Sequence, residues 1–119
     1  MDSTRKVSGW NTRNENIADN SGLNIAYMAF KKNEKFKSVV EKLAGFENFT
    51  TAQLFFIAAG NVWCHTTTYQ QQEHSLKNDV HSPGSLRVNI VMKNSIHFAQ
   101  AFNCPENSHM NPKHKCKIW

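Results

Sequence analysis

The 119-residue sequence lacks any apolar run long enough to cross a membrane. Its longest such stretch, from Leu54 to Ala59, is far shorter than the roughly 20 residues that a spanning helix needs. The segment from Met1 to Trp10 is polar, so it contains no signal-peptide core. We therefore expect no membrane segment, signal or anchor within this chain, and a secreted protein of this kind must carry its signal elsewhere.

Acidic residues are also scarce: 9 stand against 14 basic ones, which gives a formal charge of +5. A basic chain can bind nucleic acid when its cations gather into one patch. Here the lysines of residues 31–42 are diluted by Glu34 and Glu41, and a second small basic group lies at the end of the chain. A solvated helix face is the favoured interpretation, and no nucleic-acid partner is predicted.

Cysteine is present in an odd number, as Cys64, Cys104 and Cys116. At least one thiol has no partner within the chain, so the thiols are either free in an intracellular protein or paired with another segment. The tail reads C-x4-H-x4-H-x-C, with His109 and His114 between two of the cysteines. This spacing fits none of the usual zinc sites well, so a disulfide role is favoured for the cysteines.

The spacing of apolar residues predicts a mainly α fold. The predicted helices cover about 15–32, 34–43, 54–63, 71–78, 86–92 and 95–102. Thr50 and Gln53 resemble a capping box before the third helix, which is apolar enough to be buried. Ser82 is expected to cap the fifth, with Pro83 as its first residue, although β-branched residues there also favour a strand. The tail from Asn103 is expected to be irregular.

Two motifs contain groups capable of chemistry. Glu15 and Asp19 are four residues apart and share a helix face, where one carboxylate could bind a metal and the other orient a metal-bound histidine. The alternative is an acidic first turn that favours the helix dipole. Asp79, His81 and Arg87 could stabilise a developing oxyanion or hold a carbonyl. The alternative is a loop with a capping acid and a surface arginine.

The order of several sequence blocks resembles the C-terminal end of the neprilysin and endothelin-converting enzyme family. The blocks are E-N-I-A-D-N-x-G-L (15–23), Q-L-F-F (53–56), V-W-C (62–64), D-V-H-S-P-G-x-x-R (79–87), A-F-x-C (101–104), M-N-P (110–112) and C-x-x-W (116–119). The resemblance covers about residues 14–119. Residues 1–13 form a polar lead-in without it.

The resemblance implies the C-terminal helical subdomain of a thermolysin-like (gluzincin) zinc metalloendopeptidase that cleaves extracellular peptides. Such enzymes are secreted or are ectodomains of type II membrane proteins. By resemblance, Glu15 is the third zinc ligand, and Asp19 orients a zinc-binding histidine. His81 stabilises the transition state with Asp79 beside it, and Arg87 contacts the substrate backbone.

Further residues take implied roles in the same way. Val62 and Trp63 match residues that line the apolar pocket for the substrate side chain just past the cut bond. Cys64, Cys104 and Cys116 match cysteines whose disulfide partners lie outside this chain. The Asn48-Phe49-Thr50 sequon becomes a glycosylation site if the chain is extracellular.

The family's other zinc ligands and its general base come from an H-E-x-x-H motif, which this sequence does not contain. The chain therefore supplies one zinc ligand of three. We expect it to be a segment of a larger catalytic domain, dependent on the upstream remainder and inactive alone. The alternative is a truncated, non-catalytic paralogue that binds peptides or acts as a decoy.

Overall fold

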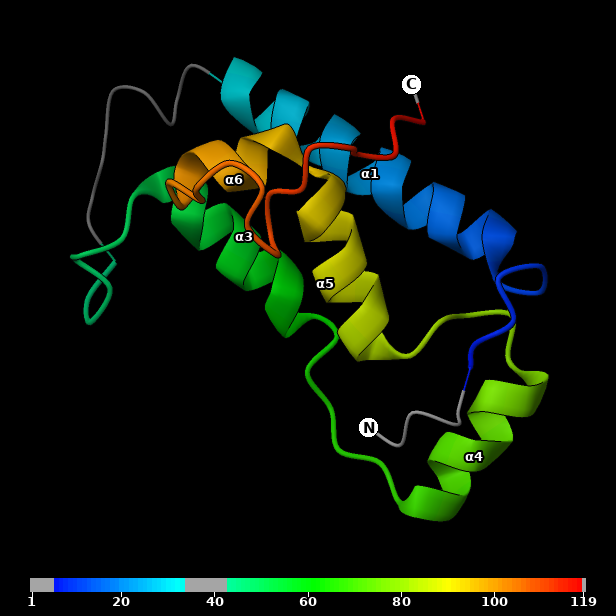
Figure 1. The fold of residues 1–119 in the computed structure, drawn as a ribbon. Helices are drawn as coiled ribbons and strands as arrows, with labels where there is room; N and C mark the ends of the chain where they lie inside the picture. The colour runs from blue at the N-terminus through cyan, green and yellow to red at the C-terminus, as the bar shows by residue number, and fades with distance from the viewer. Residues whose placement is uncertain (1–5, 34–42, 119) are drawn as a thin grey trace.

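The computed structural model describes residues 6–33 and 43–118, which form helices joined by loops (Figure 1). The helices are α1 (Arg13–Lys32), α3 (Thr51–Asn61), α4 (Tyr69–Asn78), α5 (Gly84–Asn94) and α6 (Ile96–Ala101). Within the described ranges there is no strand, only an isolated antiparallel bridge between Ser108 and Asn111. The predicted mainly α fold is confirmed. The predicted helix 34–43 lies almost entirely outside the described residues.

Helix α1 lies across one side of a group formed by α3, α5 and α6, and packs mainly on α5 (Figure 1). Helix α4 stands apart from this group, on the long connection between α3 and α5 (Figure 1). After α6 the chain is irregular, as predicted, and residues 115–118 return beside α1. The arrangement brings α1 and the segment that leads into α5 together.

The core is a cluster of aromatic and apolar side chains where α1, α3 and α5 meet. Its buried members are Tyr27, Phe56 and Met92. The Tyr27 and Phe56 rings stack with centroids 5.1 Å apart, and Phe98 meets Phe56 edge-on at 5.4 Å. Aromatic pairs in these geometries add to the free energy gained by burying apolar area. This cluster fixes the second half of α1 against α3 and α5.

Hydroxyl side chains begin three of the helices. The predicted capping box is confirmed, because Thr50 Oγ1 accepts from the Gln53 N–H and the Gln53 side chain accepts from the Thr50 N–H. Helix α4 begins at Tyr69, two residues before the predicted start, because Thr68 caps it by accepting from the Gln71 N–H. Ser95 caps α6 in the same way. Each cap satisfies a backbone donor that the first turn leaves unpaired.

The start of α5 differs from the prediction. The region is helical as favoured, but Pro83 is the N-cap rather than the first helical residue, and no side chain caps the helix. Ser82 donates its hydroxyl hydrogen to Asn16 in α1 instead. The first helical residue is Gly84, where an added Cβ would lie 2.9 Å from the Trp63 carbonyl oxygen. Glycine therefore allows α5 to begin against the turn that follows α3.

The apolar helix α3 is less buried than its sequence suggests. It ends at Asn61 rather than at residue 63, and within the chain it buries only Phe56 fully. Ile57 is 37% exposed and Val62 is 74% exposed. Among the described residues α3 is only partly buried, because one face alone packs on α5 and α6.

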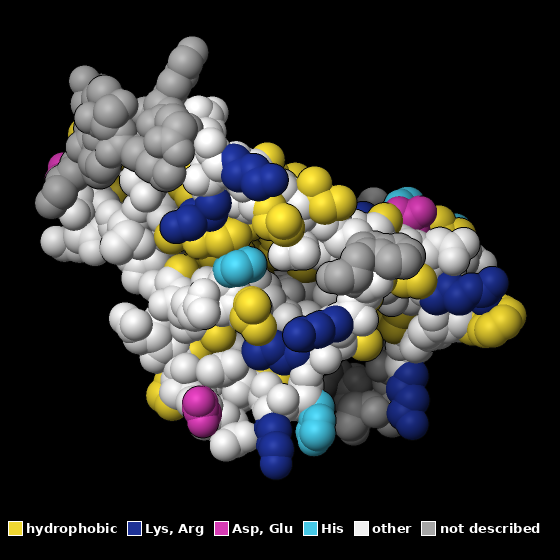
Figure 2. Space-filling view, turned by 90° about the horizontal axis from the view of Figure 1, so that it is seen from above, with side chains coloured by type: hydrophobic (Ala, Val, Ile, Leu, Met, Phe, Trp, Pro, Cys, Tyr) yellow, Lys and Arg dark blue, Asp and Glu magenta, His cyan; other side chains and the backbone are white. Residues whose placement is uncertain are grey.

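The lysines in the last turn of α1 lie at the surface, as expected for a solvated helix face. Lys31 and Lys32 are exposed in the last turn of α1. Figure 2 shows Lys and Arg side chains scattered over the upper face among apolar ones, rather than gathered in one continuous patch. No helix of the described residues is long and apolar enough to cross a membrane.

Candidate active site

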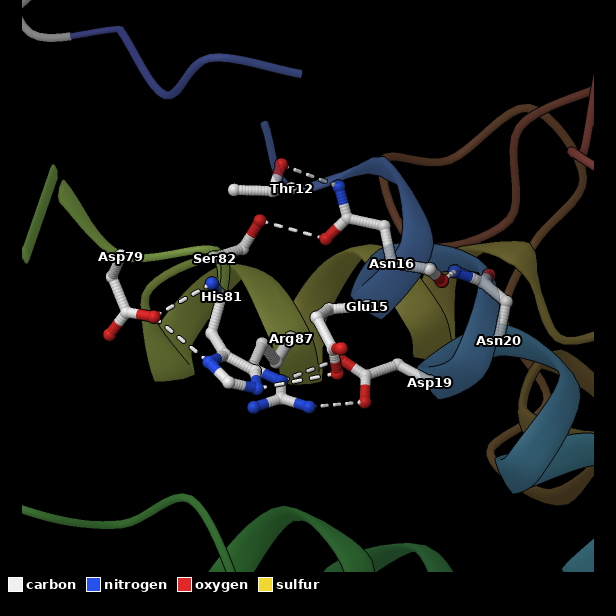
Figure 3. Close-up of polar contacts among 9 residues, drawn as sticks. All are labelled: Thr12, Glu15, Asn16, Asp19, Asn20, Asp79, His81, Ser82 and Arg87. Atoms are coloured by element: carbon white, nitrogen blue, oxygen red, sulfur yellow. Dashed lines mark hydrogen bonds and ion pairs between the residues drawn. The ribbon is translucent and has the colours of Figure 1, made fainter. Parts of the chain in front are cut away.

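The first turns of α1 face the loop that leads into α5, and a group of polar contacts joins the two (Figure 3). Glu15 and Asp19 project from one face of α1, as their spacing of four residues requires. His81 lies in the loop and Arg87 lies on α5. With Asp79 beside His81, the structure thus brings together the five residues that the two sequence motifs singled out.

Arg87 and Asp19 form a paired ionic contact across the two helices. Arg87 Nε lies 2.6 Å from Asp19 Oδ2, and Arg87 Nη2 lies 2.6 Å from Asp19 Oδ1. The two side chains are only 11% and 15% exposed. The hydrogen bonds from Arg87 to Asp19 raise the pKa of the guanidinium above its usual value, despite its burial. The guanidinium also stacks on Trp63, 3.8 Å from the ring centroid.

His81 lies between two carboxylates. Its Nδ1 and its backbone N–H both donate to Asp79 Oδ1 at 2.8 Å, while its Nε2 lies 3.3 Å from Glu15 Oε2. The backbone N–H of His81, and then its ring, hold the pKa of the Asp79 carboxyl below its usual value. An ionised carboxylate only accepts, so Nδ1 carries a proton and Nε2 is directed toward Glu15.

A second set of polar residues, which the sequence reasoning missed, joins the same two segments. Ser82 Oγ donates to Asn16 Oδ1 at 2.8 Å, and Asn16 Nδ2 donates to Thr12 Oγ1 at 3.0 Å. Ser82 is 8% exposed and Thr12 is 2% exposed. Asn16 and Ser82 stand beside Glu15 and His81 in the two motifs, and that adjacency was the available signal. Thr12 lies in the polar lead-in, where no sequence signal pointed to it.

A cavity of about 290 Å³ opens beside the ion pair. Asp19 and Arg87 line it on the polar side, and Val62 and Trp63 at the end of α3 line it with apolar residues of α1 and α5. Val62 is mostly exposed at the edge of the cavity, whereas Trp63 is half-buried. Three of the side chains that the family resemblance placed near a substrate, Arg87, Val62 and Trp63, therefore border one space with Asp19, and His81 does not line it.

The donor set for a metal is small. No group of three His, Cys, Asp or Glu side chains among the described residues could hold a metal ion. Glu15 is half-buried, and its carboxylate is directed toward His81 (Figure 3). Since a catalytic zinc takes three protein ligands, the described residues alone do not fit a zinc ion.

The remaining predicted sites are the three cysteines and the glycosylation sequon. Cys64 and Cys116 are exposed, Cys104 is half-buried, and all three are free thiols in the described residues. Asn48 is exposed in the turn before α3, where Thr50 of the sequon also serves as the helix cap. Both observations leave the predicted disulfide partners and the glycosylation as predictions.

Comparison with known proteins relates the chain to a family of peptidases. The family model described as peptidase family M13 matches residues 1–118. Neprilysin of Oryctolagus cuniculus is 44% identical over 113 residues, which cover 95% of this chain and 15% of the relative. Neprilysin-2 of Caenorhabditis elegans is 44% identical over 114 residues, or 96% of this chain and 15% of the relative. Endothelin-converting enzyme 1 of Rattus norvegicus is 42% identical over 113 residues, with coverages of 95% and 15%.

A solved structure, titled Haemonchus galactose containing glycoprotein complex, has the same fold over this region. It superposes with a TM-score of 0.88 at 39% identity and covers 95% of this chain and 20% of that chain. The present chain thus spans about 15% of the length of the relatives that it matches.

Proposed function

The chain belongs to peptidase family M13, the neprilysin and endothelin-converting enzyme family, and on this premise we propose that it forms the C-terminal part of a zinc metalloendopeptidase active site. The observation that supports this most directly is the convergence of Glu15, His81 and the Asp19–Arg87 pair in one cluster. Asp19 and Arg87 are 68 positions apart in sequence, so only the packing of α5 on α1 joins them.

In this proposal Glu15 is one zinc ligand, and the other two ligands and the catalytic glutamate come from the H-E-x-x-H helix of the upstream remainder. Zinc held by Glu15 and those upstream ligands would supply an activated water and would polarise the substrate carbonyl. Asp19 already accepts from Arg87 through both oxygens, yet each carboxylate oxygen can accept a further hydrogen bond. It can therefore orient a zinc-binding histidine while it holds Arg87.

His81 and Arg87 act on the substrate. Asp79 accepts from Nδ1, so the opposite edge of the His81 ring, with Nε2, is the edge that a substrate oxyanion meets. A protonated Nε2 donates to that oxygen in the transition state, a kind of contact that contributes about 10²–10³-fold in rate. Arg87 uses its remaining N–H groups to hold the substrate backbone, and Val62 and Trp63 contact the side chain just past the cut bond.

Substrates and location follow the family and are part of the proposal. We propose that the substrates are small extracellular peptides, that the parent enzyme is secreted or is a membrane ectodomain, and that Asn48 is glycosylated. Cys64, Cys104 and Cys116 pair with cysteines outside this chain. A chain of these 119 residues alone, with one zinc ligand, hydrolyses no peptide and holds no stoichiometric zinc.

A chimera tests the proposal. The matching C-terminal part of Oryctolagus cuniculus neprilysin is replaced with this chain, and zinc content and peptide hydrolysis are measured. We expect one zinc per chain and hydrolysis, both lost in Glu15→Gln, and a loss of about 10²–10³-fold in kcat with retained zinc in His81→Gln. His74→Gln, an exposed histidine on α4, is the matched control and leaves both unchanged.

Two results contradict the proposal. One is a chimera that binds zinc and hydrolyses peptides equally well with Glu15→Gln. The other is a folded chimera without hydrolysis, which instead favours a non-catalytic, peptide-binding descendant. For the isolated 119-residue chain, metal analysis that finds one tightly bound zinc contradicts the assignment of Glu15 as one ligand of three.

A further inference from the structure

We propose that Asn16, held between Thr12 and Ser82, is a positioning residue that anchors the loop carrying His81 to helix α1. The inference rests on the proposed function of Glu15 and His81, and it adds residues to which neither the motifs nor the family roles above assign a task. Figure 3 shows the three side chains as a hydrogen-bonded row, with Asn16 joined to Thr12 and to Ser82, beside the Glu15–His81 contact.

The hydrogen bonds of this row run in one direction, which fixes the orientation of the Asn16 amide. Thr12 Oγ1 donates to the Ser8 carbonyl oxygen at 3.1 Å, so toward Asn16 it can only accept. The Asn16 nitrogen must therefore face Thr12, at 3.0 Å, and its oxygen faces Ser82, which donates at 2.8 Å. Both ends of the amide are used, and an aspartate or a leucine at this position loses at least one of the two bonds.

Because it is buried, this row holds the loop to the helix more strongly than the exposed Glu15–His81 contact does. Ser82 and Thr12 are almost completely buried, at 8% and 2% exposed, so an unpaired hydroxyl there is costly. The Glu15–His81 contact is 37% and 43% exposed at its two side chains, and an exposed ion pair contributes little on its own. The exposed contact therefore depends on the buried one for its geometry.

Each of the two bonded anchor residues directly follows a site residue in the sequence, so the anchor also fixes the positions of the site residues. Asn16 follows Glu15 on α1, and Ser82 follows His81 in the loop, so the Asn16–Ser82 bond joins the neighbours of the two site residues. The bond from Asp79 to His81 lies within the loop and orients the ring, but it does not attach the loop to α1. Without Ser82, the next polar attachment is the Arg87–Asp19 pair, one turn into α5.

Nuclear magnetic resonance on the full 119-residue chain tests the anchor directly. The readouts are the nuclear Overhauser effects between the His81 ring and the Glu15 side chain, and the backbone order parameter at His81. Wild type is expected to show the cross-peaks and an order parameter of about 0.85, as in the helices. In Ser82→Ala we expect the cross-peaks to disappear and the order parameter to fall below about 0.6, while the Tyr27–Phe56 cross-peaks of the core remain.

A matched pair at Thr12 separates positioning from general stability. Thr12→Val keeps the shape and loses the hydroxyl, so it is expected to reproduce the loss seen in Ser82→Ala. Thr12→Ser loses a methyl group and keeps the hydroxyl, so it is expected to retain the His81–Glu15 cross-peaks even where its melting temperature is lower. If Thr12 had a purely structural role, the cross-peaks would instead be lost in whichever of the two variants has the lower melting temperature. If Thr12→Val unfolds, Ser82→Ala decides the question.

The proposal is overturned if wild type lacks the His81–Glu15 cross-peaks, or if Ser82→Ala keeps both the cross-peaks and the order parameter. Neither result depends on zinc or on peptide hydrolysis. The chimera tests the proposed function whether or not the anchor is intact, and the resonance experiment tests the anchor alone. The two proposals can therefore fail separately.

Discussion

Helix α1 contacts the rest of the chain through polar side chains in its first half and through aromatic side chains in its second. In the first half, Asn16 and Asp19 bond to the loop and to α5 with defined donors and acceptors. In the second half, Tyr27 stacks on Phe56 and meets Phe55 edge-on, with centroids 5.1 and 5.3 Å apart. One helix thus joins a candidate site to a core.

The two halves of α1 make different contributions: the aromatic half supplies most of the packing energy, and the polar half sets the geometry. Burial of apolar area contributes roughly 25 cal/mol per Å² and has no preferred direction, so the aromatic half holds α1 in place without orienting single atoms. A hydrogen bond contributes only about 1 kcal/mol net, yet it fixes distance and direction. The polar half can therefore set the positions of Glu15 and His81 only because the aromatic half keeps the helices packed.

The largest expected effect is in the aromatic half. Phe56 is 1% exposed, so Phe56→Ala leaves a cavity and is expected to lower the free energy of unfolding by about 3–5 kcal/mol. Urea denaturation followed by circular dichroism measures the change. Ile57→Ala, one position along α3 at 37% exposed, is the control and should cost much less. Equal losses in the two variants would show that Phe56 is not the centre of the core.

In the polar half, Asp19→Asn leaves the nearly buried Arg87 guanidinium without its ionic partner. We expect a loss of about 2–3 kcal/mol in the free energy of unfolding, measured by the same urea titration. Combining it with Arg87→Gln forms a double-mutant cycle, in which the two losses should be clearly less than additive. Additive losses would mean that the pair does not interact in solution.

The cap of α3 tests a contact of intermediate kind, because it is polar but supports the core helix. Thr50→Ala removes the bond that the Gln53 N–H donates to the Thr50 hydroxyl, while the bond from the Thr50 N–H to the Gln53 side chain can remain, and it is expected to cost about 1 kcal/mol in the free energy of unfolding. Thr50→Ser keeps the hydroxyl and the sequon, so it serves as the control and should remain near wild type. A wild-type midpoint for Thr50→Ala would contradict the capping role.

The smallest effect concerns pH and the loop. The backbone N–H of His81, and then its ring, lower the pKa of Asp79 below 3.8. A lowered carboxyl pKa gives stability that is present above the unfolded value and is lost as pH falls through the folded one. Asp79→Asn should therefore be slightly less stable than wild type near about pH 6, with the gap closing below about pH 3.8. Urea midpoints across that range measure it, and a constant gap would contradict the assignment.

Local features of the fold were predictable from sequence because they depend on neighbours within one turn. The Thr50–Gln53 box and the shared face of Glu15 and Asp19 are of this kind. The start of α5 was not, because Pro83 suggested a first helical position and Ser82 a cap. The serine found a better-placed acceptor on another helix, Asn16, 66 positions away.

The same distinction applies to the candidate site. The sequence alone determined which groups capable of chemistry the chain carries, their order along the chain, and its resemblance to the M13 peptidases. It could not determine that His81 meets Glu15, that Asp19 pairs with Arg87, or that Thr12 is buried. The tertiary structure decided these contacts, because burial of Tyr27, Phe56 and Met92 sets how α5 packs on α1, and that packing brings the two polar segments within hydrogen-bonding distance.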